Sequence, residues 1–252
     1  MKVTNITSKL QQLDCPVSSL LLGDFDAIGE YTAKKARGRE NNQYATTGCF
    51  FRPNYERGML ITAMVKRYKP QRVLEIGFGR GYWTTCCARA MYDAGIEGEV
   101  ISIDPHFDNA HVDMMSKLFP HEWLNLVKMT QGRSVDVLPK IEGDFDIIYI
   151  DGDHSYQAVK SDWLAIKDRF KQFVVFDDYH MQGKIDEQNE IQVARAVDEI
   201  DAKYERELIV MDREIFCDDR PEYRAGQQKY YGQVIVKHPD FEPNINEYAH
   251  DW

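Results

Sequence analysis

The feature that most constrains this chain is an apolar run that contains one acid and continues into three glycines at alternate positions, residues 73–81 (VLEIGFGRG). A continuous apolar run of this length is typical of a strand buried on both faces of a sheet. Glycine reaches positive φ at no steric cost and lets the backbone approach a ligand closely. The amide groups that open the following helix would face that ligand. The segment therefore predicts a strand that turns sharply into a helix beneath a nucleotide-like ligand.

Strands and helices alternate along the rest of the chain. Apolar runs predict seven strands, at residues 72–77, 99–103, 124–129, 145–150, 172–176, 208–211 and 233–236. Apolar residues at helical spacing predict helices at residues 57–68, from the glycines to about residue 94, and at 110–118, 134–138, 156–170 and 191–204. This alternation is typical of a Rossmann-like, doubly wound α/β fold, in which a mostly parallel sheet carries helices on both faces.

The N-terminal residues 1–56 lack a clean period and mix glycine, asparagine, aspartate and aromatic residues. We expect an N-terminal arm or cap here, made of short helices and irregular loops, and a main domain over residues 57–252. The aromatic residues of the arm either pack on the main domain or roof a pocket. A polar segment at residues 212–231 separates the last two strands, and neither segment carries a motif that identifies a substrate.

The acidic balance of the chain restricts its partners. Acids outnumber bases 41 to 31, and the formal net charge of −10 disfavours nucleic acid or another polyanion as a partner. No apolar run is long enough to span a membrane, and the first residues lack the apolar core of a signal peptide, so we expect a cytoplasmic protein. Five cysteines without a CxxC pair disfavour a disulfide framework or a zinc site. The oligomeric state stays open, a homo-oligomer included.

The spacing of the glycines discriminates between two nucleotide cofactors. A dinucleotide fingerprint is GxGxxG, with a pyrophosphate at the helix N-terminus, whereas Gly77, Gly79 and Gly81 are spaced GxGxG. Glu75, just before them, would repel a phosphate but suits a ligand that carries an ammonium group. S-adenosylmethionine has a sulfonium and an amino group and no phosphate. Asp104, at the end of the next strand, could accept hydrogen bonds from both hydroxyls of its ribose.

These residues resemble a known family. The segment 75–81 (EIGFGRG) looks like the first motif of the class I S-adenosylmethionine-dependent methyltransferases, and Asp104 matches their ribose-binding acid. The resemblance covers roughly residues 57–179 and implies a seven-stranded sheet whose last strand is antiparallel. It places Gly132 and Ser134 near the adenine. Tyr82 lies either against the methionine part of the cofactor or in ordinary packing.

Acidic residues also follow the fourth and fifth predicted strands. The segments are 151–156 (DGDHSY), in which Asp151 comes first, and 176–180 (FDDYH), which contains Asp177 and Asp178. Hard divalent cations prefer carboxylate oxygens, and adjacent strands lie about 4.8 Å apart, so acids at their ends can share one ion. Consecutive strand residues point to opposite faces, however. Asp177 and Asp178 can therefore converge only if the strand has become a turn there.

The same residues resemble the metal-dependent O-methyltransferases, especially the branch of macrocin and mycinamicin sugar O-methyltransferases. The resemblance implies Asp151, Asp177 and Asp178 as ligands of Mg²⁺ or another divalent cation, and His154 as the general base. We also count Asp151 among the cofactor-binding residues. This chain has His154 where catechol-type enzymes have lysine, and an Asp-Asp pair where they have Asp-Asn. Asp178 could therefore hold a water molecule instead of the ion.

Several of these residues have plain structural alternatives. Asp151 and Asp177 could be ordinary loop acids, and His154 could hydrogen-bond nearby backbone. Asp153 is expected in an Asx turn or helix cap, and Ser155 at a helix N-cap. We expect His180 to face the substrate or to support the site. Other side chains either line the substrate site or pack in loops: Arg52, Tyr55, Tyr179, Tyr230 and Tyr231.

We therefore predict an S-adenosylmethionine-dependent, metal-assisted O-methyltransferase that acts on a hydroxyl of a small molecule, such as a sugar or a glycosylated natural product. One alternative is a binding protein that keeps the fold and has lost catalysis. Another is a methyltransferase for a nitrogen or a non-sugar acceptor. A third is an oxygenase, because some DGDHSY proteins carry hydroxylase names, but such enzymes use a 2-His-1-carboxylate triad on a β-rich scaffold.

Overall fold

The computed structural model describes residues 1–20, 25, 28, 55–79, 81–180, 191–210 and 231–243. Within these residues, eight strands form one sheet in the order β1-β7-β8-β6-β5-β2-β3-β4. Their bounds are Lys2–Asn5 (β1), Arg72–Ile76 (β2), Glu99–Asp104 (β3), Val127–Gln131 (β4), Phe145–Ile150 (β5), Phe170–His180 (β6), Glu205–Val210 (β7) and Tyr231–Lys237 (β8). Among the described strands, only β8 runs antiparallel to its neighbours, β6 and β7. The mostly parallel sheet with an antiparallel last strand is thus confirmed.

The expected number of seven strands is wrong, because β1 adds an eighth at the edge. Lys2–Asn5 pairs in parallel with β7, in the register Lys2 to Glu207. The strand is fixed by a buried side-chain hydrogen bond from Thr4 to Glu207 and by an ion pair between Lys9 and the same carboxylate. Lys2–Asn5 therefore joins the sheet of the main domain, and the boundary at residue 56 stays a prediction.

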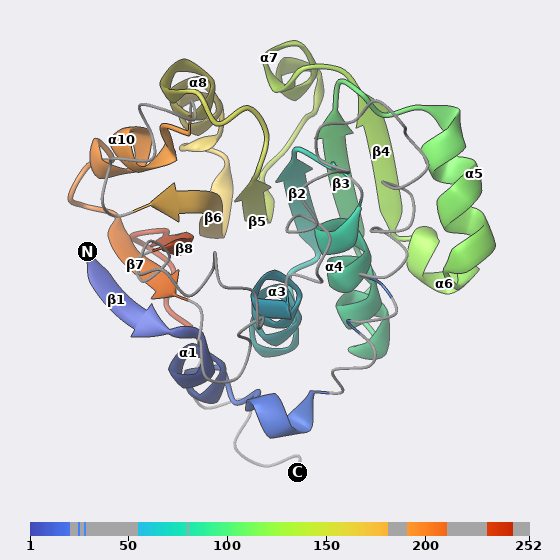
Figure 1. Cartoon of the computed structure of the whole chain (residues 1–252), viewed down its shortest axis with the longest axis horizontal. Helices are drawn as coiled ribbons and strands as arrows, with labels where there is room; N and C mark the ends of the chain where they lie inside the picture. The colour runs from blue at the N-terminus through green and yellow to red at the C-terminus, as the bar shows by residue number, and fades with distance from the viewer. Residues whose placement is uncertain are drawn as a thin grey trace, which may run out of the picture.

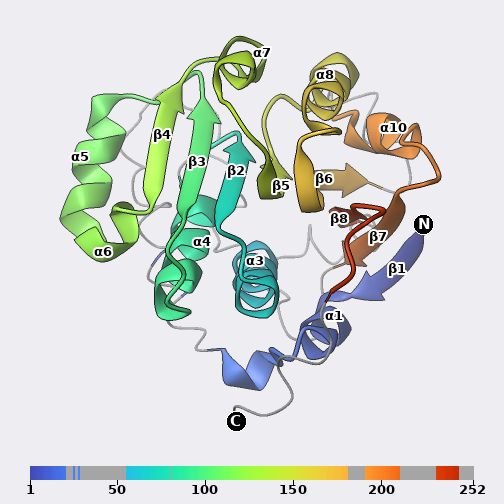
Figure 2. The ribbon, with the colours of Figure 1, turned by 180° about the vertical axis from the view of Figure 1, so that it is seen from behind.

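Helices cover both faces of the sheet (Figure 1). On one side lie α1 (Ile6–Gln12), α3 (Tyr55–Tyr68) and α4 (Tyr82–Asp93), and α5 (Asn109–Leu118) packs next to the short α6 (His121–Leu124). On the other side lie α7 (Ser134–Val137), α8 (Tyr156–Ile166) and α10 (Val193–Asp198). Two 3-10 turns also lie in the described part of the chain, η1 (Val17–Ser19) and η4 (Leu138–Lys140). The view from behind shows α8 and α10 side by side, away from α3 and α4 (Figure 2).

Three predicted boundaries are wrong for local reasons. Phe170 opens β6 instead of closing the helix, because the chain turns after Ile166 and Phe170 pairs with Phe145. Phe170 still packs against Trp163 of α8, so its helical spacing was fortuitous. The helix expected over 191–204 ends at Asp198. Leu124 belongs to α6, and the strand expected from residue 124 begins at Val127.

No helix in the part of the chain that the structure describes has the length and apolar character needed to cross a membrane. Most of the predicted N-terminal arm and the polar segment 212–230 lie outside the described residues.

Candidate active site

The glycine loop joins β2 to α4 and has the expected sharp turn. Gly77, Gly79 and Gly81 all have positive φ, at 94°, 53° and 79°, which confirms the predicted conformation. Gly77 is required by a close contact, because a Cβ there would lie 2.1 Å from the backbone oxygen of Asp151. A Cβ on Gly79 would meet no described atom within 4 Å. The loop is therefore tight beneath Gly77 and open above Gly79, where a ligand can approach.

Asp104, at the end of β3, lies against this loop. Its Oδ2 accepts a hydrogen bond of 2.9 Å from the amide of Gly79, and its Oδ1 accepts one of 2.7 Å from the amide of His106. The backbone oxygen of Asp104 also accepts from the amide of Gly132, whose φ is 149°. The structure thus brings together three of the predicted cofactor residues at the ends of β2, β3 and β4.

Glu75 lies below the loop and not in it. Its side chain is 1% exposed and accepts hydrogen bonds from the hydroxyls of Thr84 and Ser102. Burial raises the pKa of the Glu75 carboxyl to about 8, although these two hydrogen bonds lower it. The group is therefore mostly protonated at neutral pH. Its contact with an ammonium group stays a prediction, and the structure offers no fixed negative charge at this position.

Two further predicted cofactor residues face protein groups. The Tyr82 hydroxyl lies 2.7 Å from the position that a Cβ on Gly58 would take, so Tyr82 packs toward α3. The hydroxyl of Ser134 donates a 2.5 Å hydrogen bond to Asp162, a residue that the sequence did not single out. Burial raises the pKa of Asp162 to about 6. The cofactor roles of Tyr82 and Ser134 stay predictions.

The second predicted cluster assembles at the ends of β5 and β6. Asp151, His154 and Asp178 each offer an atom that could bind a metal ion, and these atoms lie within 4.8 Å of one another. Nε2 of His154 is 3.3 Å from Oδ1 of Asp151 and 3.2 Å from Oδ2 of Asp178. Residues from two neighbouring strands and the following loop thus form one acidic centre around an imidazole.

A bulge in β6 brings Asp177 and Asp178 to the same centre. The register with β8 shifts between Phe176, which pairs with Val234, and Tyr179, which pairs with Gly232. Three steps along β6 therefore correspond to two along β8, and Asp178 takes the left-handed conformation, with φ of 53°. We expected the strand to end at residue 176, before the two acids, but β6 continues to His180. The bulge has the effect that a turn would have, because it lets both acids reach the same centre.

Arg57, on the first turns of α3, is a residue of this acidic centre that the sequence did not reveal. Its Nε lies 2.6 Å from Oδ2 of Asp177, and its Nη2 lies 2.9 Å from Oδ1 of Asp178. Its Nη1 lies 3.8 Å from Oδ2 of Asp151. Arg57 and Asp178 are 121 residues apart, and no local signal in the sequence connects them.

Asp177 is the buried member of the cluster, with 1% of the residue exposed. Its Oδ2 accepts a 2.7 Å hydrogen bond from the hydroxyl of Tyr149, which in turn accepts one from the amide of Gln233. Its Oδ1 is buried without a hydrogen-bond partner among the described residues. Burial raises the pKa of Asp177 well above its ordinary value, although the charge of Arg57 opposes this shift.

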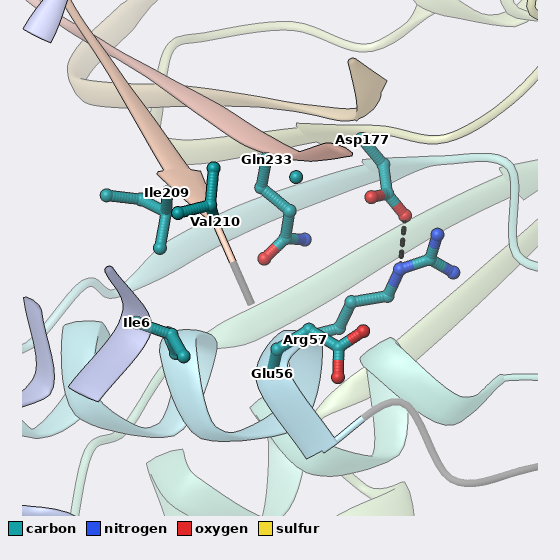
Figure 3. A pocket seen from close by; sticks show the side chains of 8 residues that line it. Ile6, Glu56, Arg57, Asp177, Ile209, Val210 and Gln233 are labelled. Atoms are coloured by element: carbon teal, nitrogen blue, oxygen red, sulfur yellow. Dashed lines mark ion pairs between the residues drawn. The ribbon is translucent and has the colours of Figure 1, made fainter. Parts of the chain in front are cut away.

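A small cavity adjoins the Arg57–Asp177 ion pair (Figure 3). Its volume is about 10 Å³, which is the space of a single water molecule. A cavity of this size can complete the hydrogen bonding of a buried carboxylate but cannot take a substrate. Its lining consists of Ile6, Glu56, Arg57, Asp177, Ile209, Val210, Gly232 and Gln233.

The charge of His154 is set by its acidic neighbours. Burial alone would lower the pKa of the imidazole, but the hydrogen bond to Asp151 and the charges of Asp178, Asp151 and Asp177 outweigh it and raise the pKa to about 9. In the protein alone, His154 is therefore an imidazolium at neutral pH. It can act as a base only when additional positive charge reaches these carboxylates.

Part of this chain is similar in sequence to known methyltransferases. Residues 74–179 match the model of a family described as a methyltransferase domain. A catechol O-methyltransferase of Niastella koreensis is 25% identical over 142 residues, which cover 54% of this chain and 62% of that protein. The chain thus spans less than two thirds of this relative.

Two solved structures show the same fold as this chain. A cofactor-bound protein from MTB has a TM-score of 0.59 and 18% identity, with 94% of this chain and 99% of that chain covered. An O-methyltransferase from Bacillus cereus, in complex with SAH, has a TM-score of 0.58 and 16% identity, with 92% and 96% covered. The fold is therefore the Rossmann-like fold of methyltransferases.

The matched methyltransferase segment contains most of the site. The glycine loop, Asp104, Asp151 and the Asp177–Asp178 pair all lie between residues 74 and 179. Arg57 of α3 and Gln233 of β8 lie outside it. The acidic centre is therefore completed by elements on both sides of the shared segment.

The structure also tests the plain alternatives. Asp153 accepts a hydrogen bond from the amide of Ser155, and Ser155 caps α8 through the amide of Ala158, so both structural predictions are confirmed. Tyr179 does not line the site, because it is buried in the core beside α8 and α10 and its hydroxyl donates to Asp198 of α10. The remaining candidates lie outside the described side chains: Arg52, Tyr55, His180, Tyr230 and Tyr231.

Proposed function

We propose that this chain is an S-adenosylmethionine-dependent, divalent-metal-assisted O-methyltransferase that acts on a hydroxyl of a small molecule. One observation carries the proposal. The amide of Asp151 donates to the backbone oxygen of Ile76, and the backbone oxygen of Asp151 touches Gly77. The loop suited to a methyl donor and the acids suited to hydroxyl activation are thus in direct contact, and both belong to the segment that matches the methyltransferase family.

The residues of the loop fit the methyl donor. The space above Gly79 is open, and the Asp104 carboxylate stands at the end of the adjacent strand, where hydroxyl groups of a ribose could replace its hydrogen bonds to backbone amides. Gly132, at the end of the next strand, lies beside Asp104, whose backbone oxygen accepts a hydrogen bond from its amide. We therefore assign Gly77, Gly79, Gly81, Asp104 and Gly132 to the cofactor. Glu75, Tyr82 and Ser134 stay predicted cofactor residues, although their side chains face protein groups in the structure.

The acidic centre fits a hard divalent cation. Asp151 and Asp178 supply carboxylate oxygens beside His154, and such ions keep several waters in their remaining positions. Asp177, the third predicted ligand, is engaged with Arg57 and Tyr149. A bound divalent cation would supply the positive charge that lowers the pKa of an acceptor hydroxyl.

His154 handles the proton. Its Nε2 is held between Asp151 and Asp178, which keep it protonated while their charge is uncompensated. Added positive charge among these carboxylates lowers the pKa of His154 and frees Nε2 to accept the proton of an acceptor hydroxyl. The hydroxyl oxygen then attacks the methyl carbon in line, the bond from that carbon to the sulfonium sulfur breaks, and S-adenosylhomocysteine is the leaving group. Because Asp151 is tied to the glycine loop, both reactants are held at a fixed separation.

The acceptor is proposed as a small hydroxylated molecule. The Niastella koreensis relative is named a catechol O-methyltransferase, which puts phenols first among the compounds to test. The sugar hydroxyl that the macrocin-type resemblance implies is the second class. The cytoplasmic location stays a prediction from the sequence, and the oligomeric state stays open.

The proposal is tested by following transfer of a labelled methyl group from S-adenosylmethionine to catechols, phenols and sugars, with Mg²⁺ and with a chelator. The H154Q variant should bind S-adenosylmethionine normally in calorimetry but lose at least about a hundredfold in kcat. The variant H121Q, a matched change at an exposed histidine of α6, should behave as the wild type. Absence of S-adenosylmethionine binding would refute the methyltransferase, and transfer that is unaffected by the chelator would refute the role of the metal.

A further inference from the structure

Two carboxylates divide the acidic centre into two sides. Asp151 directs Oδ2 toward Arg57 and Oδ1 toward His154, and Asp178 directs Oδ1 toward Arg57 and Oδ2 toward His154. One pair of oxygens therefore faces a guanidinium and the other pair faces an imidazole. We refer to these as the guanidinium side and the imidazole side.

The third acid belongs to the guanidinium side alone. Asp177 makes the shortest contact with Arg57, 2.6 Å, and its same oxygen accepts from Tyr149. It is absent from the group of potential ligand atoms that lie within 4.8 Å of one another. Only 16% of the Arg57 side chain is exposed, so this cation is held in place by the acids around it.

We propose that Arg57 is a built-in cation of this site, which confines a divalent cation to the imidazole side, between Asp151 and Asp178, and lowers the affinity of the protein for that cation. The inference rests on the metal site of the proposed function. Asp177 is then a positioning residue that anchors Arg57, and it is not a metal ligand.

The chemistry of the guanidinium supports this role. Arginine is not deprotonated in proteins, so its charge is present at every pH at which the chain folds. Two cations that share the same carboxylates repel each other strongly in a partly buried site. Arg57 comes from α3, outside the matched methyltransferase segment. The shared segment supplies the acids, and α3 sets how strongly they bind a metal.

The test measures Mn²⁺ binding to the full chain, by the paramagnetic resonance signal of free Mn²⁺, at one pH and ionic strength and without substrates. The R57Q variant should bind Mn²⁺ at least about tenfold more tightly than the wild type, because one positive charge has been removed. The R57K variant keeps the charge and should stay within about threefold of the wild type. Circular dichroism and thermal unfolding show whether each variant is folded.

A second background guards against misfolding, because R57Q alone leaves the buried Asp177 without its ion pair. In the D177N background, R57Q removes the cation without leaving a buried carboxylate unpaired. The D177N/R57Q variant should therefore bind Mn²⁺ at least about tenfold more tightly than D177N. The D178N variant removes a proposed ligand and should weaken binding at least about tenfold.

Each outcome separates the inference from the function on which it rests. Mn²⁺ binding that R57Q leaves unchanged or weakens in both backgrounds overturns the role of Arg57. If the D177N/R57Q variant loses Mn²⁺ binding as severely as D178N does, Asp177 is a metal ligand. That result also overturns the proposed role of Arg57. If no variant binds Mn²⁺, the metal site of the proposed function fails and the inference fails with it.

Discussion

The buried carboxyl of Glu75 should make the stability of this protein fall as the pH rises. Burial raises the pKa of this group from 4.5 to about 8 in the folded chain. The folded state therefore holds a proton that the unfolded state releases between these two values, and folding stability falls by about 1.36 kcal/mol per pH unit in that interval. The whole interval corresponds to at most about 5 kcal/mol.

The E75Q variant removes this titration while keeping the shape of the side chain. E75Q should gain stability relative to the wild type as the pH rises. The difference between their free energies of unfolding, E75Q minus wild type, should increase by about 3 kcal/mol between about pH 5.5 and about pH 8.5. Any constant offset, from the new amide beside Thr84 and Ser102, does not affect this slope. Urea unfolding at several pH values measures it, because the midpoint and slope give the free energy at each pH.

The matched control is E97Q, the same substitution at an exposed glutamate between α4 and β3. Its stability relative to the wild type should stay constant within about 0.5 kcal/mol over the same range. If the E75Q difference is equally flat, the carboxyl of Glu75 is ionised in the folded protein. The reasoning from burial would then be refuted, and a counter-charge for a cofactor ammonium group would be restored.

Three further predictions concern single groups. The G77A variant should lose roughly 3–5 kcal/mol of stability, measured by thermal unfolding, because its Cβ would meet the Asp151 backbone oxygen at 2.1 Å. NMR titration of the metal-free protein should give His154 a pKa near 9, and the D151N variant should lower it, since Asp151 holds its proton. Although burial opposes the shift, hydrogen bonds from Lys9 and other neighbours lower the pKa of Glu207 to about 2. The stabilisation from Glu207 is therefore present above about pH 4.5 and lost as the pH falls toward 2, and an E207Q variant should show a weaker loss of stability in acid.

The parts of the site that local sequence encodes were predictable. The three glycines at alternate positions predict three residues with positive φ between a buried strand and a helix. All three glycines have positive φ in the structure. Acids that follow buried parallel strands must meet at one edge of the sheet. Asp104, Asp151 and Asp178 accordingly lie at that edge, although strand ends alone cannot give the direction of each carboxylate.

The parts that depend on distant pairing were not predictable. The bulge that turns Asp178 toward His154 exists because β6 pairs with β8, which comes more than fifty residues later. The eighth strand, β1, has only four residues, too few to show a period, and its place depends on β7. Glu75 was assigned to the ligand because it precedes the glycines. Its actual surroundings depend on Thr84 and Ser102, which no motif connects to it.

Asp151 determines how the two halves of the site work together. Its backbone is fixed to β2 by the hydrogen bond to Ile76 and by the contact with Gly77, so it cannot move without the glycine loop. Its carboxylate divides its oxygens between Arg57 and His154. Anything that binds above the loop and shifts it must therefore also shift one oxygen of the acidic centre. Occupancy of the cofactor site and affinity for a divalent cation should consequently be coupled, and by thermodynamic linkage each ligand must change the affinity of the other by the same factor.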